Sequence, residues 1–269
     1  MCGIFCSLSK TQHVRPDPEV AKRLSARGPD SQASITTILK PGAAIGSNNH
    51  AQLTYVTLHS TVLSLRGSAT VSQPLQDGDQ RFTLCWNGEA WNIDGQRPHG
   101  NDTLLIQQLL IDTLTQPLPT SDAVDASEDG WKVAQTLSRI AGPYAFVFFD
   151  SLRGRVYFGR DFLGRRSLLR SFTDNGDLLI TSVTDGTSTA GWTEIEANGA
   201  YVVDLNALDG HCDGFAPLRI PYEFDDHSAG DHGSVGKTIL SFVSSLAHCQ
   251  VGHSPTFIEQ DHTFSAPLP

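Results

Sequence analysis

Cysteine and aliphatic side chains recur at alternate positions at the start of the chain. Within residues 2–8, Cys2, Ile4, Cys6 and Leu8 occupy every second position, and a different set of side chains lies between them. A period of two predicts a β-strand, because successive side chains of a strand point to opposite faces. Cys2 would then lie at the tip of the first strand.

Further runs of alternating, β-branched and aromatic residues predict more strands, separated by turns rich in Gly, Asn and Asp. The run at 144–149 is continuously apolar, which is typical of a strand covered on both faces. The predicted strands are Ser34–Leu39, Gln52–Leu58, Thr61–Arg66, Arg81–Trp86, Tyr144–Phe149, Arg155–Arg160, Leu178–Val183 and Ala200–Asp204.

Three segments carry helical signals. In the first, Asp17 stands as the N-cap and Pro18 at the first helical position. The second is the clearest, because Asn101 would cap a helix over Asp102–Leu114 in which apolar residues recur at helical spacing. The third is predicted between residues 131 and 140, where apolar residues recur every three positions.

Many antiparallel strands, with helices in separate blocks, predict an α+β fold. Two sheets would pack back to back, and helices would cover their outer faces. The predicted domain covers residues 2–205. After Leu205 the chain is rich in Gly, Asp, His and Pro, and only Lys237–His248 has a helical pattern. We therefore predict that residues 206–269 are a linker and a C-terminal tail of low order.

Charge and composition narrow the possible partners. The 269 residues carry a formal net charge of −10, which argues against a nucleic-acid partner. No apolar run approaches the roughly 18 residues of a membrane span, and no secretory signal is visible. The five cysteines are odd in number and widely spaced, so no disulfide framework is expected. We expect a reduced, cytoplasmic protein that binds neither nucleic acid nor membrane.

Cys2 is the candidate nucleophile. If Met1 is removed, Cys2 carries both a thiol and a free α-amine, whose ordinary pKa values lie near ~8.5 and ~7.7–8.0. The amine can then take the proton of the thiol, so one residue supplies nucleophile and base. The alternative is a small buried thiol in a first strand, which is how most free cysteines occur.

Two further positions fit carboxamide chemistry. Asn87 and Gly88 follow a predicted strand, and an Asn amide with a Gly backbone N–H can stabilise an oxyanion. The same dipeptide is also typical of a hairpin turn. Asp102 opens the strongest predicted helix and could hold a substrate ammonium group, although carboxylates are generally favoured at helix starts.

Together these segments resemble the glutamine amidotransferase domain of the N-terminal nucleophile type found in the asparagine synthetase family. The resemblance covers residues 2 to about 205. The matching segments are Met1-Cys2-Gly3-Ile4, Arg27-Gly28-Pro29-Asp30-Ser31, Trp86-Asn87-Gly88-Glu89, Asn101-Asp102-Thr103, and Ala141–Phe146 followed by Gly159–Leu168.

The resemblance implies a fold, a reaction and roles for individual residues. The fold would be a four-layer α/β/β/α sandwich. Cys2 would attack the side-chain amide of L-glutamine, and Asn87 and Gly88 would hold the oxyanion. Ammonia would leave, and water would release glutamate from the thioester. Asp102 would bind the α-ammonium, and asparagine biosynthesis would be the wider role.

The sequence departs from the family pattern at two places. Val62 stands where the family has an arginine for the glutamine α-carboxylate, and Arg66 could replace it only if the strand is bulged or shifted. No Ser-Gly-Gly-Leu-Asp phosphate loop occurs in the 269 residues, so we expect neither a synthetase domain nor a cofactor in these residues. ATP would be needed only in that domain, and the ammonia acceptor would be a separate protein.

Two alternatives follow from these observations. The chain could keep the fold but act as a catalytically silent or truncated scaffold. It could also be another amidohydrolase of the same nucleophile class. The thiol reactivity of Cys2 distinguishes an active glutamine amidotransferase from the first alternative. A requirement for a free α-ammonium on the substrate distinguishes it from the second.

Overall fold

The computed structural model describes residues 1–40, 53–115, 125–187, 191–206 and 215–223. The chain divides into two compact units, Met1–Phe224 and Asp225–Pro269. The second unit lies outside the described residues, and so does the predicted helix Lys237–His248. The fold below is that of the first unit.

The first sheet contains the N-terminal strand β1 (Gly3–Ser9) near its middle. Its six strands lie in the order β12-β10-β11-β1-β3-β2, and neighbours pair antiparallel. The other five strands are β2 (Ser31–Leu39), β3 (Thr54–Val62), β10 (Leu169–Phe172), β11 (Leu178–Thr181) and β12 (Thr193–Glu194).

The second sheet is also six-stranded and antiparallel, in the order β14-β13-β9-β8-β5-β4. Its strands are β4 (Leu75–Gln76), β5 (Phe82–Gly88), β8 (Tyr144–Asp150), β9 (Arg155–Arg160), β13 (Gly199–Asp204) and β14 (Leu218–Pro221). A small third sheet pairs β6 (Asn92–Ile93) with β7 (Ile140–Ala141).

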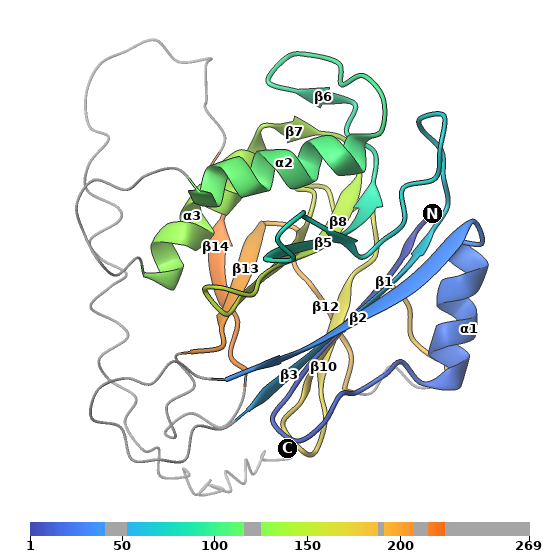
Figure 1. Cartoon of the computed structure of the whole chain (residues 1–269), viewed down its shortest axis with the longest axis vertical. Helices are drawn as coiled ribbons and strands as arrows, with labels where there is room; N and C mark the ends of the chain where they lie inside the picture. The colour runs from blue at the N-terminus through green and yellow to red at the C-terminus, as the bar shows by residue number, and fades with distance from the viewer. Residues whose placement is uncertain (41–52, 116–124, 188–190, 207–214, 224–269) are drawn as a thin grey trace, which may run out of the picture. The chain divides into compact units, whose positions relative to one another are not determined.

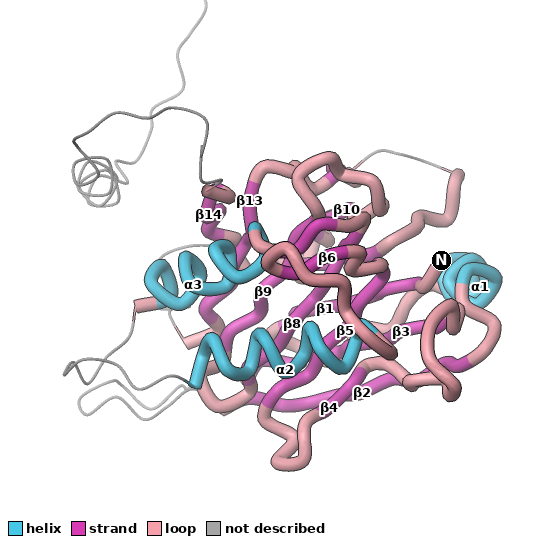
Figure 2. Tube along the Cα trace, turned by 90° about the horizontal axis from the view of Figure 1, so that it is seen from above, coloured by secondary structure: helices cyan, strands magenta, loops and turns pink. Residues whose placement is uncertain are grey.

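Three helices cover the outer faces of the two large sheets (Figures 1 and 2). Helix α1 (Pro18–Arg27) packs Val20 and Leu24 against Phe5 of the first sheet. Helices α2 (Asp102–Thr115) and α3 (Ala126–Ser138) cover the second sheet, where they bury a separate apolar cluster. The predicted helix starts are confirmed, because Asp17 caps Glu19 N at 2.9 Å and Asn101 caps Thr103 N at 3.0 Å.

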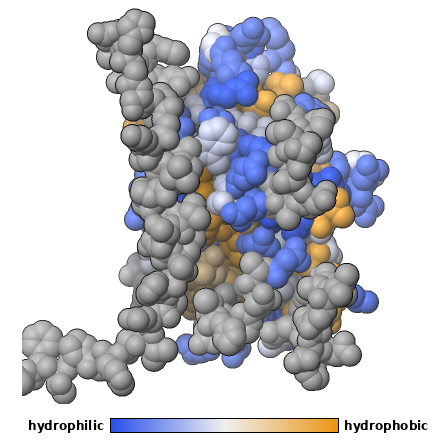
Figure 3. Space-filling model, turned by 90° about the vertical axis from the view of Figure 1, so that its left-hand side faces the viewer, coloured by the Kyte–Doolittle hydropathy of each residue, from blue (hydrophilic) through white to orange (hydrophobic). Residues whose placement is uncertain are grey.

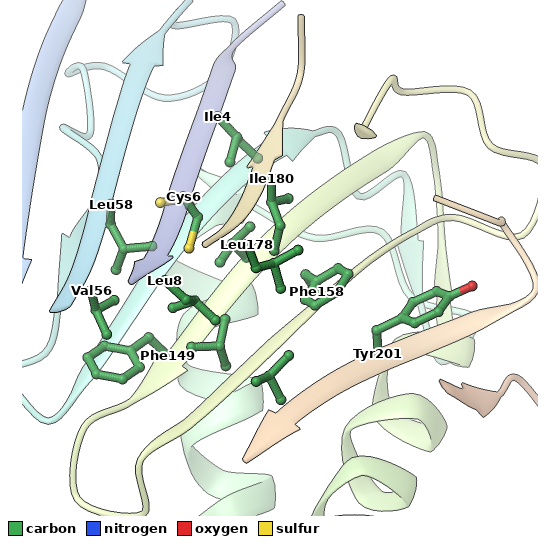
Figure 4. Packing of buried hydrophobic residues seen from close by; sticks show 14 of the residues in the cluster. Ile4, Cys6, Leu8, Val56, Leu58, Phe149, Phe158, Leu178, Ile180 and Tyr201 are labelled. Carbon is green, nitrogen blue, oxygen red and sulfur yellow. The ribbon is translucent and has the colours of Figure 1, made fainter. Parts of the chain in front are cut away.

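The main core lies between the two sheets. Figure 4 shows Ile4, Cys6 and Leu8 of β1 facing Phe149 and Phe158 of the second sheet. The period of two explains this arrangement: Cys85 of β5 belongs to this core, whereas its neighbours Leu84 and Trp86 pack against the helices. Helix, sheet, sheet and helix therefore form four layers, which confirms the α+β sandwich.

The sequence prediction differs from the structure at several places. The third helix, predicted between residues 131 and 140, begins earlier at Ala126 and ends at Ser138. A single strand, β3, replaces the two strands predicted at 52–58 and 61–66, and it ends at Val62. The short strands β4, β6, β7, β10 and β12 were not predicted, since each carries too few residues for a clear period. β14 lies inside the segment predicted as linker and tail, where it pairs with β13 and buries Ile220.

One face of the molecule carries mostly hydrophilic side chains with smaller hydrophobic patches between them (Figure 3). Among the described helices, none is both long and apolar enough to cross a membrane.

Candidate active site

A cavity lies where β1 begins, and it is lined by all five residues that the sequence predicted for the site: Cys2, Arg66, Asn87, Gly88 and Asp102. Residues far apart in sequence meet here, because Cys2 directly precedes β1 of the first sheet, the second sheet supplies Asn87 and Gly88, and the start of α2 supplies Asp102.

Cys2 is half-buried at the entrance to β1, and its Sγ donates a hydrogen bond to the carbonyl oxygen of Leu63 at 3.7 Å. Burial raises the pKa of the Cys2 thiol, and the charge of Asp102 acts in the same direction, whereas Arg27 and the N-terminal ammonium oppose it. The thiol therefore needs a nearby base to become a nucleophile at neutral pH.

Met1 lies beside the thiol and also lines the cavity. Its α-ammonium donates to the carbonyl oxygen of Arg27 at 3.3 Å, and burial lowers the pKa of this ammonium. While Met1 is attached, the nitrogen of Cys2 is a peptide nitrogen and cannot act as a base. Removal of Met1 would place a free α-amine directly on Cys2.

The turn after α1 holds the segment that receives the thiol. A Cβ at Gly28 would lie 2.3 Å from the carbonyl carbon of Thr61, so only glycine permits this approach. Two residues later, the Asp30 carboxylate accepts the backbone N–H of Ser64 at 2.7 Å. These contacts fix the path of the chain around Leu63, which explains why this turn matters to the site.

Asn87 points its side chain between the two sheets, on the same face of β5 as Cys85. The residue is 1% exposed, and its Nδ2 is buried with no hydrogen-bond partner among the described residues. Buried polar atoms normally find partners. An unused donor that lines the cavity is therefore available for a ligand oxygen.

Asp102 and Arg66 both form hydrogen bonds with the backbone of Ala90. The Asp102 carboxylate accepts the N–H of Ala90 through Oδ2 at 2.7 Å, and Arg66 donates Nη1 to the Ala90 carbonyl at 2.9 Å. Asn101 also donates to the Arg66 carbonyl at 3.2 Å. Arg66 reaches the cavity because β3 ends at Val62 and the following residues leave the strand.

Several residues of the cavity received no role from the sequence. Glu89 and Arg166 form an ion pair of 3.7 Å across it. Both belong to segments that carried the resemblance, so motif position was the available signal. Gln73 and Thr103 also line it, and no sequence pattern singled out Gln73. Within the described ranges, no group of three His, Cys, Asp or Glu side chains is placed to hold a metal ion.

Comparison with known proteins agrees with this geometry. Residues 60–186 match the family described as glutamine amidotransferase domain. The mouse asparagine synthetase domain-containing protein 1 is 31% identical over 216 residues, and the human protein of the same name is 32% identical over 216 residues. Each alignment covers 77% of this chain, which spans only 30% and 29% of those relatives.

Among solved structures, a glutamine phosphoribosylpyrophosphate amidotransferase from B. subtilis aligns with a TM-score of 0.42 and 18% identity. That alignment covers 81% of this chain and 49% of the other. The sequence comparisons, with the four-layer fold and the cavity around Cys2, lead to one assignment. The chain belongs to the glutamine amidotransferase domain family and is related to asparagine synthetase domain-containing protein 1.

Proposed function

We propose that this chain hydrolyses L-glutamine to glutamate and ammonia through a thioester on Cys2. The observation that carries the proposal is the buried, unpartnered Nδ2 of Asn87 in the cavity that contains the Cys2 thiol. A preorganised donor of this kind stabilises charge that develops only in the transition state.

The reaction begins after Met1 is removed. The α-amine of Cys2 takes the thiol proton, and the thiolate attacks the side-chain carbonyl carbon of glutamine. The oxyanion accepts hydrogen bonds from Asn87 Nδ2 and the Gly88 N–H. The C–N bond then breaks, and the leaving nitrogen takes the proton from the ammonium of Cys2. Water attacks the resulting thioester, the amine accepts a proton from that water, and the thiol is released with glutamate.

Asp102 and Arg66 account for selection of a free amino acid. Oδ2 of Asp102 is occupied by Ala90, and Oδ1 has no hydrogen bond within the described residues, so it is available to an α-ammonium. Arg66 uses one N–H on the Ala90 carbonyl and keeps other donors for an α-carboxylate. Because the two charges are anchored on one residue, they suit the closely spaced charges of a zwitterion.

The first experiment asks whether Cys2 reacts. Intact mass establishes whether Met1 is absent, and glutamate release is then compared between the unchanged protein and Cys2→Ala. We expect release to fall to background in Cys2→Ala, because no other thiol of the site can replace Cys2. Equal rates for the two proteins would end the proposal.

A glutamine-mimicking electrophile provides a second readout within one sample. It should label Cys2 and leave Cys6 and Cys85 unlabelled, since both are fully buried in the core between the sheets. These two thiols serve as internal controls for unfolding. Failure to label Cys2 would favour the alternative of a catalytically silent scaffold, which the valine at position 62 also suggests.

Substrate selection is tested with related amides. Arg66→Gln should raise KM for free glutamine by about tenfold or more, which corresponds to the loss of one charge-assisted contact. Arg170→Gln is a control, because Arg170 lies over the Tyr201 ring and does not line the cavity. Hydrolysis of amides without an α-ammonium at the same rate as glutamine would favour a different amidohydrolase.

The wider role is also a proposal. The names of the relatives suggest that the ammonia serves asparagine biosynthesis, with a synthetase site on another protein as the acceptor. Cys2, Cys6 and Cys85 are free thiols, which suits the reducing cytoplasm. This role is tested by asking whether the chain co-purifies with an ATP-dependent synthetase that takes up the ammonia. Release of all ammonia to solvent would argue against the role.

A further inference from the structure

Gln73 lies in the cavity wall and belongs to neither the predicted site nor any assigned motif. It is 2% exposed and lines the cavity next to Trp86 and Asn87. Its side-chain oxygen accepts the backbone N–H of Trp86 at 2.6 Å, and its Nε2 lies 3.4 Å from the hydroxyl oxygen of Thr103. One buried amide thus connects the strand that carries Asn87 to the first turn of α2.

The register of the second sheet shows which side of β5 the Gly88 amide faces. Glu89 donates its N–H to the Pro143 carbonyl at 3.0 Å, and the β5–β8 register places Gly88 opposite Tyr144. Because hydrogen-bonded and non-bonded pairs alternate in an antiparallel ladder, Gly88 and Tyr144 form a non-bonded pair. The N–H of Gly88 therefore points away from β8, to the same side as the N–H of Trp86.

On that side of β5, strand β4 pairs with only part of the length of β5. Strand β4 pairs Gln76 with Thr83 and Leu75 with Leu84. Continuing the same register would place Gln73 opposite Trp86, but β4 begins only at Leu75. The side chain of Gln73 replaces the missing backbone and satisfies the N–H of Trp86. Among the described strands none continues β4 beyond Gln73, so Gly88 faces the cavity without a ladder partner.

We propose that Gln73 is a positioning residue that holds the open end of β5 so that the Gly88 N–H faces the cavity as the second oxyanion donor. This inference rests on the proposed glutaminase function. Without the bond from Gln73, the N–H of Trp86 loses its acceptor, and the end of β5 loses its tie to α2. The N–H of Gly88 would then no longer be held in the direction of the cavity. Asp102 would still bind Ala90.

The chain offers a closely matched control. Gln107 lies one helical turn after Thr103 on α2 and donates its Nε2 to the Leu75 carbonyl at 2.7 Å. It is also buried, at 7% exposed, and it links α2 to the neighbouring strand β4, but it does not line the cavity. Gln73→Met and Gln107→Met each remove one buried amide that links residues 73–76 to α2.

We expect Gln73→Met to lower kcat for glutamine by about tenfold, a part of the loss that follows complete removal of an oxyanion donor, with KM changed by less than about twofold. Gln107→Met should keep kcat within about twofold while melting earlier. Gln73→Glu retains an acceptor for Trp86 and should recover most of kcat. Equal kcat for Gln73→Met and Gln107→Met would overturn the inference while leaving the glutaminase proposal intact.

Amide hydrogen exchange supplies a readout that does not need activity. In the unchanged protein the Trp86 amide should exchange slowly and the Gly88 amide quickly. Gln73→Met should accelerate exchange at Trp86 by at least about tenfold, and Gln107→Met should not. Unchanged exchange at Trp86 in Gln73→Met would overturn the inference. If the unchanged protein releases no glutamate, the proposed function fails, and this exchange pattern alone decides whether Gln73 holds the strand.

Discussion

At the scale of single residues, the wall of the cavity contains a buried hydrogen-bond donor that no described residue satisfies. Asn87 Nδ2 is buried without a hydrogen-bond partner in the described part of the chain, which costs stability on the order of 1–3 kcal/mol. A fold retains such an atom more readily when a ligand uses it. Activity and stability should therefore respond in opposite directions when the amide is removed.

Asn87→Leu tests this opposition, because leucine has a similar volume and no polar atom. We expect kcat for glutamine to fall by about 10²–10³. The free energy of unfolding in urea should be unchanged or higher, since an unpaired buried donor is removed. Asn198→Leu, at an exposed asparagine that donates to Glu196, should leave kcat unchanged. A clear loss of stability in Asn87→Leu would mean that Asn87 is a packing residue.

His59 offers a residue-scale test of pH dependence. It is 5% exposed on β3, its Nδ1 lies 2.8 Å from Ser34 Oγ, and its Nε2 has no partner among the described residues. Burial lowers the pKa of His59 below that of the unfolded chain, which is near ~6.5. As pH falls through that value, the unfolded chain gains a proton that the folded protein does not.

The free energy of unfolding should therefore decrease as pH falls from about 6.5, until the pH reaches the lower pKa of the folded state. His59→Gln should flatten this slope between about pH 5 and 7 in urea titrations. His13→Gln serves as the control, because His13 follows β1 and contacts Tyr55 and Thr57, which lie on the same face of β3 as His59. An unchanged slope in His59→Gln would assign the effect to another group.

At the scale of elements, the turn between α1 and β2 positions residues 61–66, which lead from the end of β3 into the cavity wall. Gly28 lies directly against the backbone of Thr61 and Val62 at the end of β3. The turn also holds Ser64 through Asp30, so movement of the turn displaces the loop that contains Leu63 and Arg66.

Gly28→Ala should therefore cost at least about 1–3 kcal/mol of unfolding free energy, the range for overpacking, because the added Cβ meets backbone atoms that cannot rotate away. Urea denaturation measures this loss, and KM for glutamine should rise with it. Gly78→Ala is the matched control, since a Cβ there meets nothing within 4 Å. Equal stability of the two variants would show that the turn yields without strain.

At the scale of the whole molecule, the second sheet extends past the boundary that composition suggested. Phe215 is fully buried in the core between the sheets, and β14 adds an edge strand to β13. Tyr222 also donates its hydroxyl to the Arg160 carbonyl at 2.8 Å. The segment after Leu205 therefore contributes to the stability of the domain.

Two truncations test this contribution. A chain ending at Glu223 should keep the thermal transition of the full chain, because it retains β14 and Phe215. A chain ending at Leu205 should lose at least about 3–5 kcal/mol, the cost of removing one large buried aromatic side chain. Calorimetry compares the two. Equal melting temperatures would place the domain boundary at Leu205, as the sequence predicted.

The sequence by itself determined the features that depend on neighbours along the chain. Alternation at Cys2–Leu8, the caps at Asp17 and Asn101, and ordered motifs around Asn87 and Asp102 are local patterns, and local geometry produces them. The family could be inferred from those motifs, because their order and spacing can be read without knowing how the chain packs.

Only the tertiary structure decided how the cavity is assembled. No local pattern explains why β3 stops at Val62, which brings Arg66 to Ala90, or why Gln73 takes the place of a strand beside Trp86. These contacts join residues from separate elements, and their free energy depends on which groups the fold buries together. No pattern along one segment records that choice.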